Sequence, residues 1–570
     1  MLPRNWSRVR NLFFSLLLIS SAAHAAAAAP ANIILVTLES TRADRMGFLG
    51  SRSGLTPHLD ALARQSIVFE RAYAQAPLTV VSHATILSGS YPQTNQASDL
   101  GNPISNDTPW LPRLLHAKGY RTAAFVGTVA LDPENGLAPG FERGFDVYDA
   151  DFHPDQPLGG RERASQRTAD EVVVRATKWL NANSMHPFFL WVQLNDADAP
   201  ETSYNRAVAR VNAAAGKLVA TLEALGLYDD AIVVVASDHG EALGSHAEGT
   251  HGTLLYDETI RVPLLLKLPQ NQLAGKRVRG RVRLLDIAPS ALEAARIPVP
   301  SQMQGQSLLR IARTNPDVDQ PAYARTDFPQ QAFGWSPLES WRVGKYLYIR
   351  APKPELYDLT RDPATAHNLA QTSKAILDTM ASQLESFRSH FGNQSGRPAS
   401  ELTSTEIQKL ASLGYVGLQK SSSDPGSAPT GTDPKDAIAT ANQVLKVLGR
   451  LSSSKSEVDA QALQQAVSQQ PHAFLAQYSL GLVLARQQHY PQAIEHLHKA
   501  IELQPASVWA HYAMGRNLIN TGDFKTAAVH LELVRDRMPK FREARLRLAQ
   551  SYEHLGQSKQ AEAERDKAGH

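Results

Sequence analysis

The stretch Ile33–Leu38 (IILVTL) and the glutamate that follows it, Glu39, decide the fold class of this chain. An almost uninterrupted apolar run is typical of a strand that is buried on both faces of a parallel sheet. The runs at 187–194 (PFFLWVQL) and 231–236 (AIVVVA) repeat this pattern. Strands that alternate with helices predict an α/β domain with helices on both faces of its sheet. Helical patterns span 59–68 and 111–118, and a further short strand is predicted over 122–126.

Chemically useful side chains follow two of these predicted strands directly. Glu39 follows the first strand, and Asp238 and His239 follow the run at 231–236. Open α/β sheets bind ligands at the carboxyl ends of their strands, so these side chains lie where a ligand site is expected. With Thr79 they provide two carboxylates, an imidazole and a hydroxyl. If the four converge, they can hold a divalent metal ion with the Thr79 hydroxyl as nucleophile, which predicts a hydrolase or transferase of phosphate or sulfate esters.

Each of these residues also has an ordinary structural interpretation. An Asp-His pair after a strand can simply be hydrogen-bonded at the strand end. The presence of His239, His246 and His251 in one short Gly-rich segment favours metal binding, because histidine is the commonest metal ligand. Thr79 precedes a helical pattern that begins near Ser82, and this segment alone favours a helix cap, supplied by Thr79 or by Ser82.

The composition narrows the classes of function. The chain has 570 residues, of which 43% are hydrophobic and 20% charged, and this suits a globular protein with more than one domain. A formal net charge of +3 over this length argues against a dedicated nucleic-acid-binding protein. The chain contains no cysteine, which excludes disulfides, a cysteine nucleophile and a thiolate zinc site.

The first residues resemble a targeting segment rather than part of a fold. Three arginines precede the apolar run 12–19, and Ala23-His24-Ala25 offers a small-x-small cleavage site. Residues 1–25 are therefore predicted to be a signal peptide, which places the mature protein in the periplasm or outside the cell. An uncleaved membrane anchor is the alternative, although the apolar run is short for a membrane span.

The C-terminal part of the chain is organised differently from the α/β region, which is predicted to span 31–418. Residues 419–433 are rich in Ser, Gly and Pro and are interpreted as a flexible linker. Beyond it, prolines recur every 34 residues, which is the period of tetratricopeptide repeats. An all-α domain is therefore predicted over 434–570, and stacked helix pairs of this kind offer a concave face to a protein or peptide partner. The predicted repeats are 472–505, 506–539 and 540–570, preceded by a degenerate repeat or a cap at 434–470.

From Asn32 to about Leu369 the chain resembles the sulfatase branch of the alkaline phosphatase superfamily. The matching segments, in family order, are NIILVTLESTRADRMGFLG, TPHLDALA, APLTVVSHATILSGSYP, SDHGEALG, THGTLLYDETIRVPLLL, LLDIAPSALEAARIPVP and ELYDLTRDPATAHNLA. The resemblance implies a doubly wound, mostly parallel sheet with a metal ion at the strand ends. It implies that Glu39, Asp238 and His239 are metal ligands and that Thr79 is the nucleophile, itself bound to the metal ion.

Several positions depart from the pattern of the family. Sulfatases that cleave sulfate esters carry, at the position of Thr79, a Cys or Ser that becomes formylglycine, in a motif that ends in Arg. Thr79 does not give that aldehyde and His83 stands at the Arg position, so phosphate esters are favoured. Glu39 replaces the usual Asp, and the resulting ligand set is similar to that of phosphoethanolamine and phosphoglycerol transferases. His251 falls where relatives place a substrate-contacting Lys or a second-metal His. Asp198 replaces a His, and either binds a second metal ion with His251 or marks the loss of that site.

One main prediction and one alternative follow. The main prediction is an exported metal-dependent hydrolase or transferase that holds one or two divalent ions (Zn, Mn or Ca). Its substrate is a small-molecule, lipid or glycan ester of phosphate or sulfate. Thr79 attacks the ester, while His251 and His83 contact the transferred group or the leaving group. The alternative is a non-catalytic envelope protein, in which a degenerate α/β domain carries repeats that bind a partner.

Overall fold

The computed structural model describes residues 31–97, 104–134, 138–150, 166–196, 201–314, 317, 319–391, 430–449 and 457–569. The predicted signal peptide, most of the predicted linker and Asp198 lie outside these residues. No helix within the described residues is long and apolar enough to cross a membrane.

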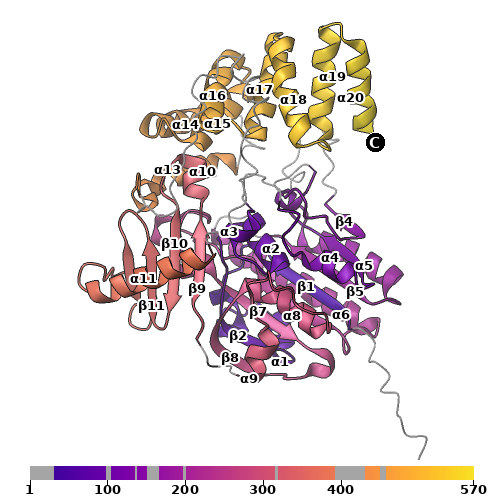
Figure 1. Cartoon of the computed structure of the whole chain (residues 1–570), viewed down its shortest axis with the longest axis vertical. Helices are drawn as coiled ribbons and strands as arrows, with labels where there is room; N and C mark the ends of the chain where they lie inside the picture. The colour runs from indigo at the N-terminus through magenta and orange to yellow at the C-terminus, as the bar shows by residue number, and fades with distance from the viewer. Residues whose placement is uncertain are drawn as a thin grey trace, which may run out of the picture.

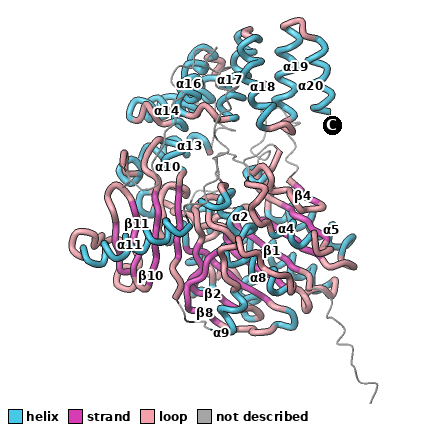
Figure 2. Tube along the Cα trace, in the orientation of Figure 1, coloured by secondary structure: helices cyan, strands magenta, loops and turns pink. Residues whose placement is uncertain are grey.

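An eight-stranded sheet with the order β4-β3-β5-β1-β6-β7-β2-β8 forms the centre of the larger domain (Figures 1 and 2). Its strands pair in parallel, except that β7 is antiparallel to β6 and to β2. The strands are β1 (Ile33–Leu38), β2 (Ile67–Tyr73), β3 (Arg121–Phe125), β4 (Val147–Asp149), β5 (Phe188–Leu194), β6 (Ile232–Ser237), β7 (Arg261–Lys267) and β8 (Arg277–Arg283).

Helices cover both faces of this sheet and enclose two apolar cores. One face packs against α1 (Pro57–Arg64), α5 (Ala169–Asn183) and α6 (Glu201–Ala224). The other packs against α2 (Thr79–Ser88), α4 (Leu111–His116), α8 (Ile287–Ala294) and α9 (Leu308–Thr314). The predicted doubly wound, mostly parallel α/β fold is confirmed. The short helices α3 and α7 span Pro92–Asn95 and Asp257–Ile260.

Two sequence-based boundaries were wrong. The helix predicted over 59–68 ends at Arg64 as α1, and Ile67 already begins β2. The run Ile67-Val68-Phe69 consists of β-branched and aromatic residues, which favour a strand. The helix expected to begin near Ser82 begins at Thr79, with Leu78 as its N-cap residue.

A second, antiparallel sheet lies beside the first and was not predicted from the sequence. Its strand order is β12-β11-β10-β9, and α11 (Lys374–Phe391) packs against it (Figure 1). The strands are β9 (Ala322–Thr326), β10 (Leu338–Val343), β11 (Tyr346–Arg350) and β12 (Glu355–Asp358), and the short helix α10 (Phe328–Phe333) follows β9.

Paired helices form the C-terminal part of the chain, one pair for each predicted repeat (orange to yellow in Figure 1). Gly481 and Gly515 occupy equivalent helix crossings, where an added Cβ would lie 2.7 Å from a leucine of the facing helix. The helices are α13 (Pro434–Leu448), α14 (Glu457–Gln469), α15 (Phe474–Arg486), α16 (Tyr490–Leu503), α17 (Val508–Thr521), α18 (Phe524–Arg537), α19 (Arg542–His554) and α20 (Ser558–Gly569).

The first of these helices share an apolar core with the second sheet. One buried cluster joins side chains of β9, β10 and β11, such as Leu338 and Leu347, with side chains of α13, α14 and α15, such as Val444, Leu463 and Leu480. Residue 434 therefore marks the start of helices but does not separate two independent cores.

A buried polar pair joins the two helices of each repeat at the same position. The first member of each pair also donates a hydrogen bond to the backbone carbonyl of the proline that precedes the repeat. The paired positions repeat every 34 residues, so the two helices of each repeat are joined at the same place by a different pair of side chains. The pairs are Gln477–His496, His511–His530 and Arg545–Glu564.

The middle pair depends on a specific protonation state. His511 Nε2 donates to the carbonyl of Pro505 at 2.9 Å, so its Nδ1 accepts from the Nδ1–H of His530 at 2.7 Å. Burial, reinforced by His511 and by His498 of α16, holds the pKa of His530 well below its usual value of 6.5. From α19, Arg545 pairs with Glu564 of α20 and belongs to the last repeat.

We predict that acid weakens the repeats at this pair. Because the pKa of His530 is lowered on folding, its contribution is fully present above about pH 6.5 and is lost as the pH falls below that value; each unit of depression is worth about 1.4 kcal/mol. The variant His511→Gln recreates the Gln–His pair of the first repeat, whose amide oxygen accepts equally well from a protonated imidazole. Hydrogen exchange of α17 and α18 should accelerate less on acidification in this variant than in the parent. Equal acceleration in both proteins would contradict the prediction.

Candidate active site

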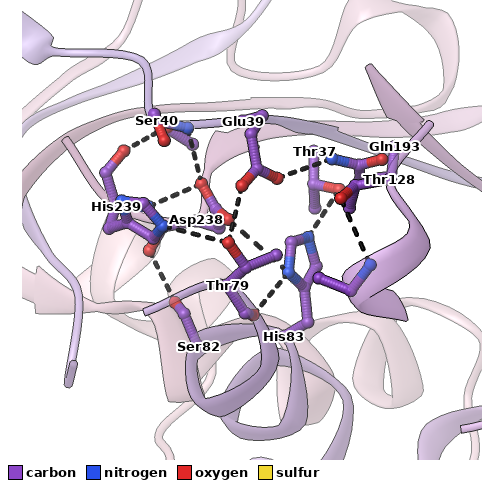
Figure 3. Close-up of polar contacts among 12 residues, drawn as sticks. Thr37, Glu39, Ser40, Thr79, Ser82, His83, Thr128, Gln193, Asp238 and His239 are labelled. Atoms are coloured by element: carbon purple, nitrogen blue, oxygen red, sulfur yellow. Dashed lines mark hydrogen bonds and ion pairs between the residues drawn. The ribbon is translucent and has the colours of Figure 1, made fainter. Parts of the chain in front are cut away.

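Strand pairing brings Glu39 and Asp238 side by side. Strands β1 and β6 are parallel neighbours with Leu38 opposite Ser237, so the residues that follow them emerge together at one edge of the sheet. Glu39, Asp238 and His239 form a buried group whose candidate ligand atoms all lie within 4.8 Å of one another. Figure 3 shows Thr79, the first residue of α2, directed into the same group. The four side chains singled out in the sequence thus converge.

The Thr79 hydroxyl is held by the candidate ligands themselves. Its Oγ1 donates to Glu39 Oε1 at 2.6 Å and lies 3.3 Å from His239 Nε2 (Figure 3). Neither hydroxyl of this segment caps the helix, because Ser82 lies inside α2 and donates to the backbone carbonyl of Asp238 at 2.5 Å. The interpretation of Thr79 or Ser82 as a helix cap was therefore wrong, and Thr79 is available for chemistry.

The donor atoms fit a divalent metal ion. Asp238 Oδ1 accepts from the backbone N–H groups of Ser40 and His239, at 3.0 and 2.8 Å, whereas Oδ2 is buried without a hydrogen-bond partner. His239 Nδ1 donates to the carbonyl of Gly240 at 2.8 Å, which leaves the Nε2 lone pair facing the group. An unpartnered buried carboxylate oxygen is unfavourable, and a cation is the natural partner for it. Two carboxylates and an imidazole suit zinc or manganese.

Burial dominates the pKa values of Asp238 and His239. Burial raises the pKa of Asp238 to about 7, although two backbone N–H groups oppose this. Burial, with His251 nearby, lowers the pKa of His239 to about 3. A bound cation reverses the effect on the carboxylate, because it stabilises the charged form that burial disfavours.

Supporting residues that sequence reasoning missed hold the ligands in place. Gln193 Nε2 donates to Glu39 Oε2 at 2.6 Å. Ser40 adopts a left-handed conformation with φ of 49°, and its carbonyl accepts from the Tyr204 hydroxyl at 2.7 Å. A non-glycine residue in this region is strained, and such strain is concentrated at functional sites. A polar Gln193 in an otherwise apolar strand was a usable signal, but nothing in the sequence pointed to Tyr204.

His83 lies beneath Thr79, with its Nδ1 3.6 Å from Asp238 Oδ2. Its Nδ1 donates to the carbonyl of Thr79 at 2.8 Å, and its Nε2 accepts from the hydroxyl of Thr37 at 2.9 Å. Both ring nitrogens are therefore engaged by the protein, and burial lowers the pKa of His83 to about 3, so it is neutral. The structure shows His83 hydrogen-bonded to the backbone of Thr79, and its expected contact with the substrate stays a prediction.

His251 stands beside the donor group as a cation. Its ring centroid is 4.3 Å from that of His239, and its Nδ1 donates to Glu241 Oε2 at 3.0 Å. Burial opposes the charged form, but Glu241, together with Glu39 and Glu248, raises the pKa of His251 to about 10. This charge agrees with the Lys-like position that the resemblance gave to His251. A second metal site shared with Asp198 stays a prediction, because Asp198 lies outside the described residues.

Helix α10 connects the surroundings of the site with the repeats. The Phe328 ring packs against Leu78, which precedes Thr79, and lies near Gly252, which follows His251. On its other side α10 packs against α15, and the Gln504 side chain donates to the carbonyl of Gln331. At the other end of the array Lys540 pairs with Glu134 at 3.1 Å. The repeats are therefore anchored on the larger domain rather than tethered to it.

Comparison with known protein families accounts for this arrangement. Residues 31–297 match the family model described as sulfatase, and the strand-end site lies within this match. The domain that carries the site thus matches the sulfatase family. Residues 250–390 match the C-terminal region of N-sulphoglucosamine sulphohydrolase, which accounts for the second sheet. Residues 474–507 and 512–568 match tetratricopeptide-repeat models, so the predicted repeats are confirmed.

Individual relatives are also sulfatases. The chain is 27% identical over 412 residues to an ulvan-active sulfatase of Formosa agariphila, a match that covers 62% of this chain and 79% of the relative. It is 23% identical over 494 residues to N-acetylgalactosamine-6-sulfatase of Rattus norvegicus, covering 71% and 94% of the two chains. The prediction of a sulfatase-like ester hydrolase is therefore confirmed at the level of the family.

Solved structures confirm the fold of the sulfatase domain. The phosphonate monoester hydrolase of Agrobacterium radiobacter superposes with a TM-score of 0.53 at 20% identity, over 63% of this chain and 96% of that one. A protein solved in complex with its substrate D-glucosamine-2-N,6-O-disulfate superposes with a TM-score of 0.54 at 19% identity, over 65% and 100% of the two chains.

We predict that Asp238→Asn separates metal binding from stability. In metal-free protein the variant should melt at or above the parent temperature, because it removes a buried carboxylate oxygen that has no partner, a defect worth about 1–3 kcal/mol. Zinc or manganese should raise the melting temperature of the parent by binding the folded state and leave the variant unchanged. Calorimetry and elemental analysis measure both effects.

Asp286→Asn is the matched control, because Asp286 is equally buried but its oxygens accept from Arg283 and Gln306. This variant should lose stability and keep the metal response. A metal-dependent rise that persists in Asp238→Asn would contradict the assignment of Asp238 as a ligand.

Proposed function

We propose that the sulfatase domain is a metal-dependent ester hydrolase that attacks a phosphate or sulfate ester with the Thr79 hydroxyl. One observation carries this proposal: Thr79 Oγ1 lies at the start of α2, hydrogen-bonded to Glu39 at 2.6 Å, within a buried group of oxygen and nitrogen donors. A divalent ion held by Glu39, Asp238 and His239 would lower the pKa of the Thr79 hydroxyl and screen the anionic ester.

The side chains support a two-step reaction. Thr79 Oγ1 attacks the phosphorus or sulfur atom, its proton passes to Glu39 Oε1, which already accepts its hydrogen bond, and the bond to the leaving alcohol breaks. Water then attacks the esterified threonine, which releases phosphate or sulfate and restores the hydroxyl. The cationic His251 and the free N–H groups at the start of α2 are placed to stabilise the non-bridging oxygens.

The identity of Thr79 favours a phosphate ester. Resemblance to the family associates sulfate-ester cleavage with a formylglycine made from Cys or Ser, and threonine does not give this group. Similarity to an ulvan-active sulfatase and to an N-acetylgalactosamine-6-sulfatase supports a sulfate ester as the second candidate. Whether the ester is a phosphate or a sulfate, the same similarity supports a glycan as the molecule that carries it. The predicted signal peptide would place the enzyme in the periplasm or outside the cell, and the repeats would bind a protein or peptide partner there.

We expect Thr79→Ala to lower kcat for aryl phosphate and aryl sulfate esters by at least about a thousand-fold, because it removes the attacking atom. Bound metal should remain measurable, since Glu39, Asp238 and His239 are retained. Thr85→Ala is the matched control: Thr85 is a buried threonine of the same helix, whose hydroxyl donates to the carbonyl of Val81 at 2.9 Å.

Steady-state kinetics on both ester series, with a full set of divalent ions, decides between the candidates. Equal turnover by the two variants would refute the nucleophile assignment. A parent protein that binds no divalent ion and cleaves neither ester would favour the alternative of a non-catalytic partner-binding protein.

A further inference from the structure

A second polar cleft lies outside the Thr79 site. It has a volume of about 330 Å³ and opens between the main sheet and the turn that joins β10 to β11. The side chains that line it come from the loop after β1, from β2, β7 and β8, and from that turn. They include Arg42, Tyr73, Arg261, Arg281 and Lys345.

The acidic groups in this cleft are already paired. Asp44 binds Arg42 at 2.7 Å, and Glu258 binds His246 at 2.5 Å. Asp257 binds Arg342, a buried arginine outside the cleft lining, at 3.0 Å. Arg261 donates to the backbone carbonyl of Glu70 at 3.0 Å and forms no ion pair within the described part of the chain; its charge acts on Asp44 from a distance, where it adds to Arg42 and Arg45 in lowering the pKa of that carboxyl against burial.

Two guanidinium groups in the cleft keep unused donors. The Nε–H of Arg281, a residue that is 2% exposed, has no hydrogen-bond partner, and the Nε–H of Arg261 is also buried without one. Arg281 otherwise donates to the carbonyl of Arg342 at 2.7 Å and pairs with Asp319 at 2.8 Å. Burial lowers the pKa of Arg281, which indicates that its cation is incompletely compensated. An anionic ligand supplies what such donors lack, because two oxygens of a carboxylate or phosphate group match the spacing of the guanidinium donors.

The cleft lies at the same edge of the sheet as Thr79. Tyr73 ends β2, pairs with Arg261 at the start of β7, and the chain runs from it through Ala74–Leu78 directly to Thr79. Arg42 follows Glu39 in the loop after β1. The cleft and Thr79 thus lie along one edge of the sheet.

We propose that this cleft binds a second anionic group of a polyanionic glycan whose ester lies at Thr79. The proposal rests on the proposed function and refines it: the substrate is a glycan that carries several sulfate, phosphate or carboxylate groups. The cleft selects glycans that have a second anionic group near the ester that is cleaved. The acidic group would accept from Arg261 and Arg281; Lys345, at the rim, is already paired with Asp358 at 2.7 Å.

The test measures binding rather than turnover. Arg261→Gln removes a cleft cation at a partly exposed position, which avoids the buried Arg281. Arg277→Gln is the control, because Arg277 lies on β8 outside the cleft and pairs with Glu70 at 2.5 Å. Calorimetric titration with a polysulfated oligosaccharide should give a Kd about tenfold weaker for Arg261→Gln than for the parent and for Arg277→Gln.

The ligand series gives the deciding contrast. A monosulfated monosaccharide carries a single anionic group, so its Kd should not separate the two variants. An oligosaccharide Kd that is the same in all three proteins would overturn the cleft assignment, even if esters are cleaved. A Kd loss specific to Arg261→Gln in a protein that cleaves no ester would uphold the cleft and refute the proposed function.

Discussion

The in-register pairing of β1 with β6 is the constraint on which the site depends. It places Glu39 beside Asp238 at the point where both chains leave the sheet. Because side chains alternate between the faces of a strand, a slip of one residue would turn one of the two carboxylates to the opposite face. Every residue of β1 and β6 is buried, so such a slip would also force the cores on both faces of the sheet to repack. Core packing, not the site itself, therefore aligns the ligands.

Around this pair, other residues of the protein hold the oxygens of Glu39 and Asp238 in place, although the two carboxylates repel each other. Gln193 fixes one oxygen of Glu39, and backbone N–H groups, including that of the strained Ser40, fix one oxygen of Asp238. The other Asp238 oxygen is kept without a partner. His83 supports the backbone of Thr79 from below. This arrangement pre-organises negative charge at one point, which is how a strong cation site is built from few ligands.

The sequence predicted the elements whose apolar pattern is continuous. The strands at 33–38 and 231–236 agree with β1 and β6 within one residue, and the four polar residues of the site were found because they follow or precede such elements. The second sheet was missed, since its short strands mix buried polar residues such as Glu339 and Ser340 with apolar ones. The role of His83 depended on which way its ring points, and Tyr204 reaches the site from a distant helix; local pattern contains neither fact.

The core shared by the second sheet and helices α13 to α15 has a consequence for how this protein is made. The strands β9 to β11 are synthesised well before Val444, Leu463 and Leu480, which cover them in the finished molecule. Until those helices follow, a nascent chain exposes apolar side chains and unpaired strand edges, the features that promote aggregation during folding. Helices made later thus complete a layer begun much earlier, and a protein that ends before α13 would resemble an unfinished folding intermediate more than a trimmed enzyme.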